Sequence, residues 1–417
     1  MTIDLVETRR IGLGSAPDWL VVANTVVEPT LVVVILARDE ALLIDRTIKG
    51  LQRILPSWGE VHVVADHCKD ATASLARRAG AVVHIRSDRE LPGKGPALSW
   101  WLEKTHRQAN ARDIVVVLDA DSQVAPDFFL RMRSHLDQGA VAVQARLEPR
   151  LCSSSPVTRL AAFSEIAEHR VNDTLRSRLG WPVRLRGTGM AFRRGVLGQL
   201  AGSLHTLVED AELSILLAAE GFPITFAPET YVVDPKPADE SGAVRQRARW
   251  LKGQGQVLRS YPAQILRLLT KGPAGWSLLS SIFLKPKTLL VPIKAAALFA
   301  ALMAHTLWGG PIWIGLTLLG GVSLLMDLGV YLFSLRYVSD KKETMKALAL
   351  APLYLALWLK SLALSVVSGN SWLRARPRAP LSPMAEAPTR PIRFVTGMEV
   401  GALVAVREVE RVIGQGP

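Results

Sequence analysis

The sequence predicts an α/β domain with a mostly parallel central sheet, followed by helices that associate with a membrane. Within residues 30–255, short apolar runs suited to strands alternate with helical patterns. This alternation is typical of parallel strands joined by crossover helices. Three long apolar runs follow within residues 289–368. Each is long enough to cross a bilayer, which takes roughly 20 residues.

Composition narrows the class of protein. The 417 residues exceed one ordinary domain, and 49% hydrophobic residues with a positive mean hydropathy do not fit a disordered chain. A formal net charge of +13 suits anionic lipid or a phosphorylated substrate. No basic tract with interleaved aromatic residues indicates nucleic acid as a partner. Cys68 and Cys152 lack metal-ligand spacing and fit a reducing compartment.

The N-terminal segment, residues 1–29, does not resemble a secretory signal peptide. It carries acidic and basic residues before any apolar run, namely Asp4, Glu7, Arg9 and Arg10. We therefore expect the domain that follows to lie on the cytoplasmic side of a membrane.

The first strands of the domain end at charged residues. Strands are predicted at 31–37, 60–65 and 81–85, and a fourth begins the stretch Ile-Val-Val-Val-Leu-Asp-Ala-Asp at 114–121. In a parallel sheet, ligands bind beyond the carboxyl ends of the strands. The carboxylates expected to gather there are Glu40, Asp66 and Asp119.

Two of these strand ends suggest a phosphate site. Asp119 and Asp121 supply the oxygen ligands that Mg²⁺ or Mn²⁺ prefers, although Asp is also common in simple turns. Lys94 lies between two glycines, where a flexible backbone brings an amine to a phosphate or leaves it as a solvated charge. On these residues alone, both alternatives remain open.

The middle of the domain adds a glycine pair and an acidic pair. Gly187 and Gly189 flank Thr188, which suits a backbone that approaches a ligand closely. Glu209 and Asp210 precede an apolar helical run. They fit either a helix N-terminus favoured by the helix dipole or a general base that takes a proton from an attacking hydroxyl.

The segment Gln246-Arg247-Ala248-Arg249-Trp250 is predicted to be helical. Offsets of three and four residues place Gln246, Arg249 and Trp250 on roughly one face. The guanidinium of Arg249 suits a diphosphate, and Trp250 offers a flat surface to a sugar ring. The same pattern would also suit a basic helix lying on a membrane.

Taken together, these motifs resemble those of the family 2 glycosyltransferases, especially the membrane-embedded cellulose, chitin and hyaluronan synthases. The resemblance covers about residues 30–255 and depends on the order and approximate spacing of the motifs. It implies a GT-A domain that binds a nucleotide-diphosphate sugar, expected to be a UDP-sugar, with a divalent cation. The chain departs from the family at Leu36 and Asp39, where Pro and Asn are frequent.

The resemblance also implies a role for each motif. Asp210, with Glu209 beside it, would be the catalytic base of an inverting displacement, and Asp121 with Asp119 would hold the metal. Gly187, Thr188, Gly189 and Trp250 would contact the acceptor. The nucleotide sugar would be bound by Ala37, Glu40, Asp66, Lys94, Asp119, Ala120, Gln246 and Arg249.

Beyond the domain, residues 256–288 read as amphipathic helices in the membrane interface. Transmembrane helices are predicted at 289–308, 311–335 and 347–367. Charges inside such helices are costly unless paired, so we expect Asp327 and Lys360 to face each other or to line a polar route. Basic residues favour a cytoplasmic side both for the loop before the third helix and for the tail, residues 369–417, which leaves the number of crossings open.

The expected protein is a multi-pass enzyme of the plasma (inner) membrane with a cytoplasmic catalytic domain. Three functions remain. The first is extension of a polysaccharide, with an unknown export partner. The second is transfer of one sugar to a lipid or polyprenyl-phosphate acceptor. The third is a non-catalytic membrane scaffold or transporter subunit.

Overall fold

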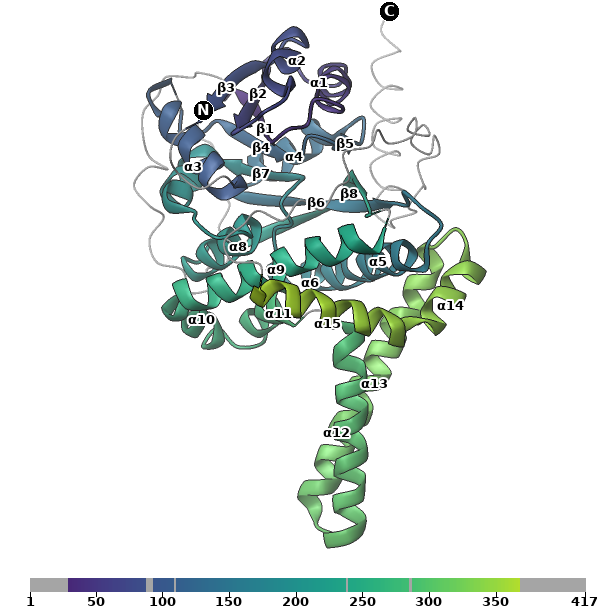
Figure 1. Cartoon of the computed structure of the whole chain (residues 1–417). Coiled ribbons are helices and arrows are strands. Elements are labelled where there is room, and N and C mark those ends of the chain that lie inside the picture. Colours follow the sequence, from purple (N-terminus) through teal and green to yellow (C-terminus); the bar gives the residue numbers. More distant parts are fainter. Residues whose placement is uncertain (1–28, 88–92, 109, 238, 285–286, 368–417) are drawn as a thin grey trace, which may run out of the picture. The chain divides into compact units, whose positions relative to one another are not determined.

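The computed structural model describes residues 29–87, 93–108, 110–237, 239–284 and 287–367. The expectations for residues 1–28 and for the tail lie outside these described residues. The described strands form one eight-stranded sheet in the order β3-β2-β1-β4-β7-β6-β8-β5 (Figure 1). Their bounds are Leu31–Ala37 (β1), Gly59–Asp66 (β2), Val82–Arg86 (β3), Ile114–Leu118 (β4), Gln123–Val124 (β5), Ala142–Arg150 (β6), Met190–Arg193 (β7) and Ile224–Pro235 (β8).

The α/β prediction is confirmed, with a sheet that is mixed in detail. β1 pairs in parallel with both β2 and β4, β2 with β3, and β6 with β8. β7 runs antiparallel to both β4 and β6, and β5 runs antiparallel to β8. β7 therefore joins the parallel half of the sheet, β3-β2-β1-β4, to the β6 and β8 pair.

Burial on both faces explains the uniformly apolar strands. In β1, Val33 and Ile35 belong to one hydrophobic core, and Val32 and Val34 belong to the core on the opposite face. Side chains alternate between the faces of a strand, so a strand covered on both sides must be apolar throughout. The first core includes residues of α1 (Ile44–Gln52), α2 (Thr72–Arg78) and α4 (Phe128–Asp137), and the second includes residues of α3 (Lys94–Lys104), α7 (Arg194–Leu200) and α8 (Glu209–Ala219).

Helices close the side of the domain from which the long apolar helices extend. α5 (Pro156–Ile166) continues through a π-helical segment, Ala167–Asp173, into α6 (Thr174–Arg178). α9 (Glu240–Ser260) leads into α10 (Pro262–Leu269) and α11 (Pro273–Phe283). Apolar residues of α10 and α11 pack in one cluster with α8, while Leu266, Trp276 and Leu284 remain exposed. Residues 256–288 thus contain helices with a buried and an exposed apolar side, and their expected place in the membrane interface stays a prediction.

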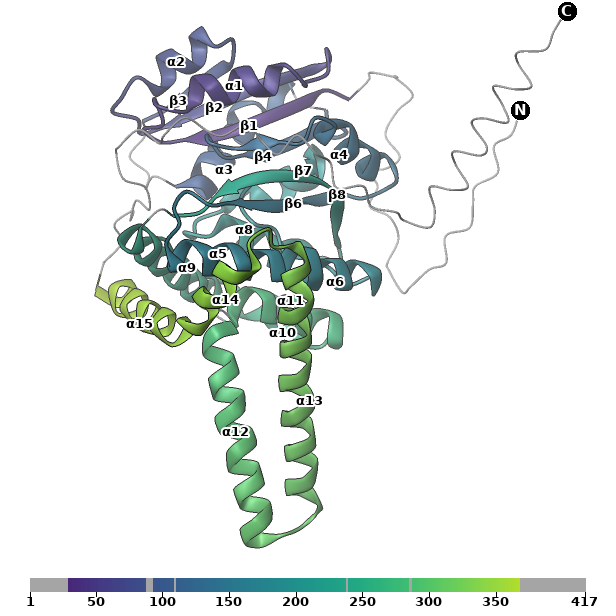
Figure 2. The same ribbon diagram turned by 90° about the vertical axis from the view of Figure 1, so that its right-hand side faces the viewer.

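α12 (Lys287–Trp308) and α13 (Pro311–Ser334) form an antiparallel hairpin that extends from the domain (Figures 1 and 2). Both are long and apolar enough to cross a membrane. Asp327 of α13 accepts a hydrogen bond from Lys294 of α12 at 2.6 Å. The expected pairing of Asp327 with Lys360 is therefore wrong, because the hairpin brings Lys294 to the level of Asp327. The alternative, that Asp327 and Lys360 line a polar route, stays a prediction.

The third expected span falls on α14 (Lys341–Ala349) and α15 (Ala351–Val367), which are bent by 63° at a break between them. Tyr354, Leu357 and Trp358 of α15 are buried in a cluster with residues of α5 and α9. α15 lies alongside α9 (Figure 1). The two helices together remain long and apolar enough for a broken span or a re-entrant loop, so the number of crossings stays a prediction.

Candidate functional site

Four elements bring charged residues together at the carboxyl edge of the parallel strands. Lys94, the first residue of α3, forms an ion pair with Asp119, which directly follows β4. Glu209 begins α8, and Arg249 lies on α9. Both are close enough to Lys94 to influence its pKa. Predicted site residues from distant parts of the chain therefore lie in one cluster.

The pKa values in this cluster reflect burial and neighbouring charges. Burial opposes the charge on Lys94, but Asp119 and Glu209 outweigh it and raise the pKa of this amine. Burial raises the pKa of Glu209 to about 7, with a further contribution from Asp210 and an opposing one from Lys94. Lys94 therefore remains charged at neutral pH, whereas Glu209 exchanges a proton near neutrality.

The raised pKa of Glu209 predicts a pH-dependent stability. A folded state that keeps a proton which the unfolded chain loses becomes less stable as pH rises from about 4.5 to about 7. Relative to Glu209→Gln, the wild-type free energy of unfolding should fall across this window by an amount on the order of 3 kcal/mol. Denaturant unfolding of both proteins at several pH values measures the difference, and parallel curves would contradict it.

The turn carrying Asp119, Ala120 and Asp121 is held by hydroxyl groups. The backbone N–H of Asp119 donates to Ser122 Oγ at 3.0 Å and to Thr188 Oγ1 at 3.1 Å. Thr47 Oγ1 on α1 donates to the carbonyl oxygen of Ala120 at 2.7 Å. Asp121 is buried, with 7% of the residue exposed. The contacts hold the backbone of the turn that carries both carboxylates.

The Gly187-Thr188-Gly189 loop supports that turn. Gly187 and Gly189 have φ values of 79° and 65°, which favour glycine. A Cβ on Gly187 would lie 3.5 Å from Glu209 Oε1 and 3.9 Å from Lys94 Nζ, so this backbone borders the charged cluster. Thr188 is 4% exposed, and its hydroxyl binds Asp119 and Ser122. Thr188 thus positions the turn, and its expected acceptor contact stays a prediction.

Asp66 anchors the segment that precedes Lys94. Its carboxylate accepts hydrogen bonds from Arg86 Nη1 at 2.7 Å and from the N–H of Gly93 at 2.9 Å. Ala37 is buried at the end of β1. The N–H of Glu40 donates to Thr72 Oγ1 at 2.7 Å. These predicted nucleotide-binding residues therefore lie on neighbouring strand ends, as expected, and their ligand contacts stay predictions.

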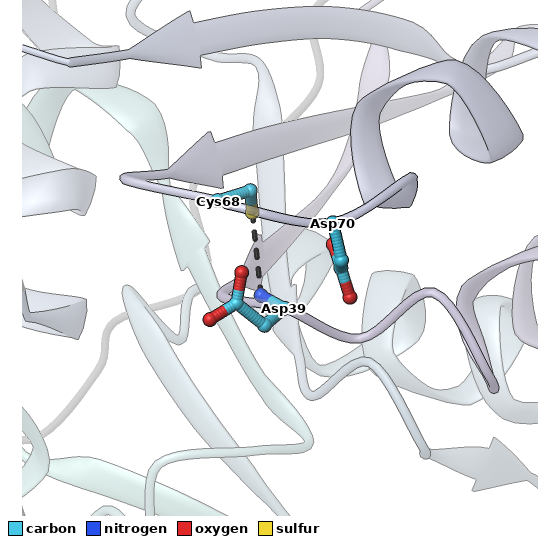
Figure 3. Close-up of side chains that lie close together, drawn as sticks. All are labelled: Asp39, Cys68 and Asp70. Atoms are coloured by element: carbon cyan, nitrogen blue, oxygen red, sulfur yellow. Dashed lines mark hydrogen bonds between the residues drawn. The ribbon is translucent and has the colours of Figure 1, made fainter. Parts of the chain in front are cut away.

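The loops after β1 and β2 bring Asp39, Cys68 and Asp70 together (Figure 3). One ligand atom from each lies within 4.8 Å of the others. The N–H of Asp39 donates to Cys68 Sγ at 3.3 Å, and Asp39 has a φ of 52°. A thiol among carboxylates is a mixed donor set, whereas Mg²⁺ prefers oxygen ligands alone. The sequence motifs did not indicate this group.

The predicted motif at residues 246–250 lies on α9, and its side chains point to two different faces of that helix. Arg249 lies near Lys94 and Glu209, and Trp250 is 38% exposed, which leaves its ring accessible. Gln246 is half-buried on the same helix. Arg247 instead points to α15, where it donates to the hydroxyl of Tyr354. The predicted face of Gln246, Arg249 and Trp250 therefore excludes Arg247.

Sequence reasoning missed a lysine near the predicted metal turn. Lys236 directly follows β8, is buried, and forms ion pairs with Glu165 and Asp234. Asp121 lies close enough to exert an electrostatic attraction on it. A charged residue at the carboxyl end of a strand was the available signal, the same one that identified Asp66 and Asp119.

Comparison with known proteins gives one family match. The model described as "Glycosyltransferase like family 2" matches residues 29–253. This range begins just before β1 and ends within α9, so it contains all of the predicted site residues.

Three curated relatives are similar over part of their length. "Probable glycosyltransferase YdaM" of Bacillus subtilis is 25% identical over 58% of this chain and 59% of its own length. "Beta-monoglucosyldiacylglycerol synthase" of a Nostoc species is 26% identical over 66% of this chain and 59% of its own length. "N-acetylglucosaminyltransferase" of Sinorhizobium fredii is 25% identical over 66% of this chain and 67% of its own length. The chain thus spans about three fifths of the length of the first two relatives.

Two solved structures are also similar. The mannosyltransferase PcManGT from Pyrobaculum calidifontis, in complex with GDP-Man and Mn²⁺, has a TM-score of 0.47 and 19% identity, covering 84% of this chain and 92% of that one. Glucosyl-3-phosphoglycerate synthase from Mycobacterium tuberculosis, in complex with Mn²⁺, UDP and glucosyl-3-phosphoglycerate, has a TM-score of 0.35 and 24% identity. The match covers 48% of this chain and 69% of that one.

Proposed function

We propose a specific reaction for this chain. The chain belongs to the glycosyltransferase like family 2 and is therefore an enzyme that transfers a sugar from a nucleotide-sugar donor. The GT-A domain transfers one sugar from a nucleotide-diphosphate sugar to a lipid acceptor at a membrane, with inversion at the anomeric carbon. The observation that carries this proposal is the convergence of Lys94, Asp119, Glu209 and Arg249 at the carboxyl edge of the sheet.

The residues of the cluster have complementary tasks. Asp210, half-exposed at the start of α8, takes the proton from the attacking acceptor hydroxyl. Arg249 and Lys94 bind the diphosphate and stabilise the charge that develops on it as the sugar leaves. Direct displacement by the acceptor inverts the anomeric carbon without a covalent intermediate. Trp250 supports the sugar ring of the acceptor or donor with its exposed face.

Asp119 and Asp121 suit a divalent cation by the chemistry of their donors. Two carboxylates on one turn, fixed by the bonds of Ser122, Thr188 and Thr47, offer the oxygen ligands that Mg²⁺ or Mn²⁺ prefers. Bound there, the ion would neutralise charge on the diphosphate leaving group. Lys94, already paired with Asp119, adds a second positive charge beside the same group.

The membrane hairpin favours a lipid acceptor. α12 and α13 are apolar and largely exposed along their length, so a bilayer would cover them. Exposed Leu266, Trp276 and Leu284 would then meet the membrane surface on the same side of the domain. An acceptor held in that bilayer reaches the site by moving along the surface. The relative named for monoglucosyldiacylglycerol synthesis adds support for this class of acceptor.

Polysaccharide extension is the second candidate. It is favoured by the predicted face of Gln246, Arg249 and Trp250, which resembles that of polymer-forming synthases. Both proposals place the protein in the plasma membrane with its catalytic domain in the cytoplasm. Nucleotide sugars are made in the cytoplasm, and the basic loop containing Arg336, Lys341 and Lys342 favours the cytoplasmic side.

The function is tested with purified full chain in lipid nanodiscs and a panel of nucleotide sugars. We expect one donor to release nucleoside diphosphate and to yield a lipid carrying a single sugar. Removal of divalent cations with EDTA should reduce the rate at least about a hundredfold, and Mg²⁺ or Mn²⁺ should restore it. A long polymer as product would select the second candidate, and the absence of nucleotide release with every donor would refute both.

A further inference from the structure

We propose that Arg184 and Arg186 bind a phosphate group of the acceptor, and that the acceptor is consequently a phosphate-bearing lipid. This inference rests on the proposed function and names the substrate class of the same site. Both residues precede the Gly187-Thr188-Gly189 loop, and the intervening Leu185 is buried in the core. The sequence analysis had assigned no role to either arginine.

Each arginine has a buried N–H that lacks an acceptor. Arg186 donates from Nη2 to Asp173 Oδ2 at 2.5 Å, and its side chain is 5% exposed. Arg184 donates from Nη1 to the carbonyl oxygen of Ser281 at 3.2 Å. In the described part of the chain, the Nε atoms of both residues are buried without a hydrogen-bond partner. Buried donors are ordinarily satisfied, so two such atoms, in residues two positions apart in the chain, indicate a ligand that accepts hydrogen bonds.

The surrounding ion pairs engage the other arginines rather than Arg184. Arg176 Nη1 donates to Glu168 and Asp173, both at 2.8 Å, and Arg186 shares Asp173. Three carboxylates, Glu168, Asp173 and Asp210, attract Arg184, but it forms no ion pair with another described residue. A phosphate would give its guanidinium the direct charged partner that these carboxylates do not provide.

Arg184 also lies close enough to the proposed base, Asp210, for their charges to interact. Burial, then repulsion by Arg186, lowers the pKa of Arg184 to about 10, while attraction by Asp210 opposes the shift. Even with this lower pKa, Arg184 is charged at neutral pH. Asp210 accepts a hydrogen bond from the N–H of Ala211 at 2.9 Å. A phosphate on Arg184 would therefore hold the acceptor with a neighbouring hydroxyl beside Asp210.

Contacts to α11 place Arg184, together with Arg176, close to the expected membrane surface. Ser281, which binds Arg184, and Ser277, which accepts from Arg176 Nε at 3.0 Å, both belong to α11. The same helix exposes Trp276, and Leu284 follows at its end. α11 lies on the side of the domain from which the hairpin extends (Figure 1). Lipid headgroup phosphates lie at that level, which favours a lipid over a soluble phosphate ester.

Binding is measured without a donor sugar. The full chain in neutral detergent is heated with increasing dihexanoyl phosphatidic acid, inorganic phosphate or dihexanoylglycerol, and the midpoint of unfolding is followed. We expect saturable stabilisation by phosphatidic acid, much weaker stabilisation by inorganic phosphate and none by dihexanoylglycerol. Arg184→Gln should weaken the apparent affinity for phosphatidic acid about tenfold or more, since it removes charge-assisted hydrogen bonds.

Arg178→Gln is the matched control, because Arg178 is exposed on nearby α6 and the change in net charge is the same. Arg186→Lys keeps a cation beside Asp173 but loses the guanidinium fork, so it should also weaken binding. This variant provides the test if Arg184→Gln proves unstable. Equal affinities in Arg184→Gln, Arg186→Lys and the control would overturn the proposed site. Inorganic phosphate that binds as tightly as phosphatidic acid would overturn the lipid assignment.

This test is independent of the proposed reaction. Failure to release nucleoside diphosphate from any donor would remove the transferase function but would leave the binding result intact. Loss of phosphate binding with retained transfer would remove only this inference. In an active enzyme, Arg184→Gln should raise the KM for the acceptor lipid, whereas the control Arg178→Gln should leave that KM unchanged.

Discussion

Asp210→Asn is expected to abolish sugar transfer while nucleotide binding is retained. Asparagine has nearly the same shape as aspartate but cannot take the proton of the acceptor hydroxyl, and loss of a general base typically costs about 10²- to 10⁴-fold in rate. Asp210 is half-exposed, whereas neighbouring Glu209 is buried and has a pKa raised by that burial to about 7. Asp210 is thus the carboxylate better placed to meet an acceptor.

The measurement compares kcat for transfer with the dissociation constant for the nucleoside diphosphate from titration calorimetry. Glu220→Gln is the control, because Glu220 directly follows the same helix and its side chain forms a surface ion pair with Arg267. Its activity should match the wild type. Transfer by Asp210→Asn at a rate within tenfold of the wild type would assign the base to another residue.

Arg247→Ala is expected to destabilise the protein and loosen α15. Arg247 is 4% exposed, and its guanidinium lies 4.3 Å from the ring centroid of Tyr354 and 5.2 Å from that of Trp358. It also donates a hydrogen bond to the Tyr354 hydroxyl. Truncation removes this stacking and leaves a cavity between α9 and α15, with an expected cost of about 2–4 kcal/mol.

Thermal unfolding in detergent measures the loss of stability, and limited proteolysis reports on access to α15. Arg259→Gln is the control, because Arg259 is exposed near the end of the same helix. Transfer by Arg247→Ala should fall as well, since Gln246 and Arg249 are carried by α9. An unfolding midpoint equal to that of Arg259→Gln would show that the contact with α15 contributes nothing to stability.

The sequence by itself determined the class of fold and the general position of the site. The uniformly apolar residues of β1 and β4 required burial on both faces, and helices between the strands required parallel pairing. Because parallel strands end at one edge, Asp66 and Asp119 could be assigned to one place, and the family resemblance added Lys94 before its ion pair with Asp119 was known. These inferences succeed because periodicity and strand ends depend on neighbouring residues in the chain.

Only the tertiary structure decided which partner each polar group has. Thr188 binds the backbone of Asp119, Arg247 binds α15, and Asp327 pairs with Lys294 rather than Lys360. The buried arginines before Gly187 became visible in the same way, through donors that face no acceptor. A residue pattern encodes how far a side chain is exposed, because exposure follows the local period. It does not encode a hydrogen-bond partner, because that partner is set by the packing of segments far apart in the chain.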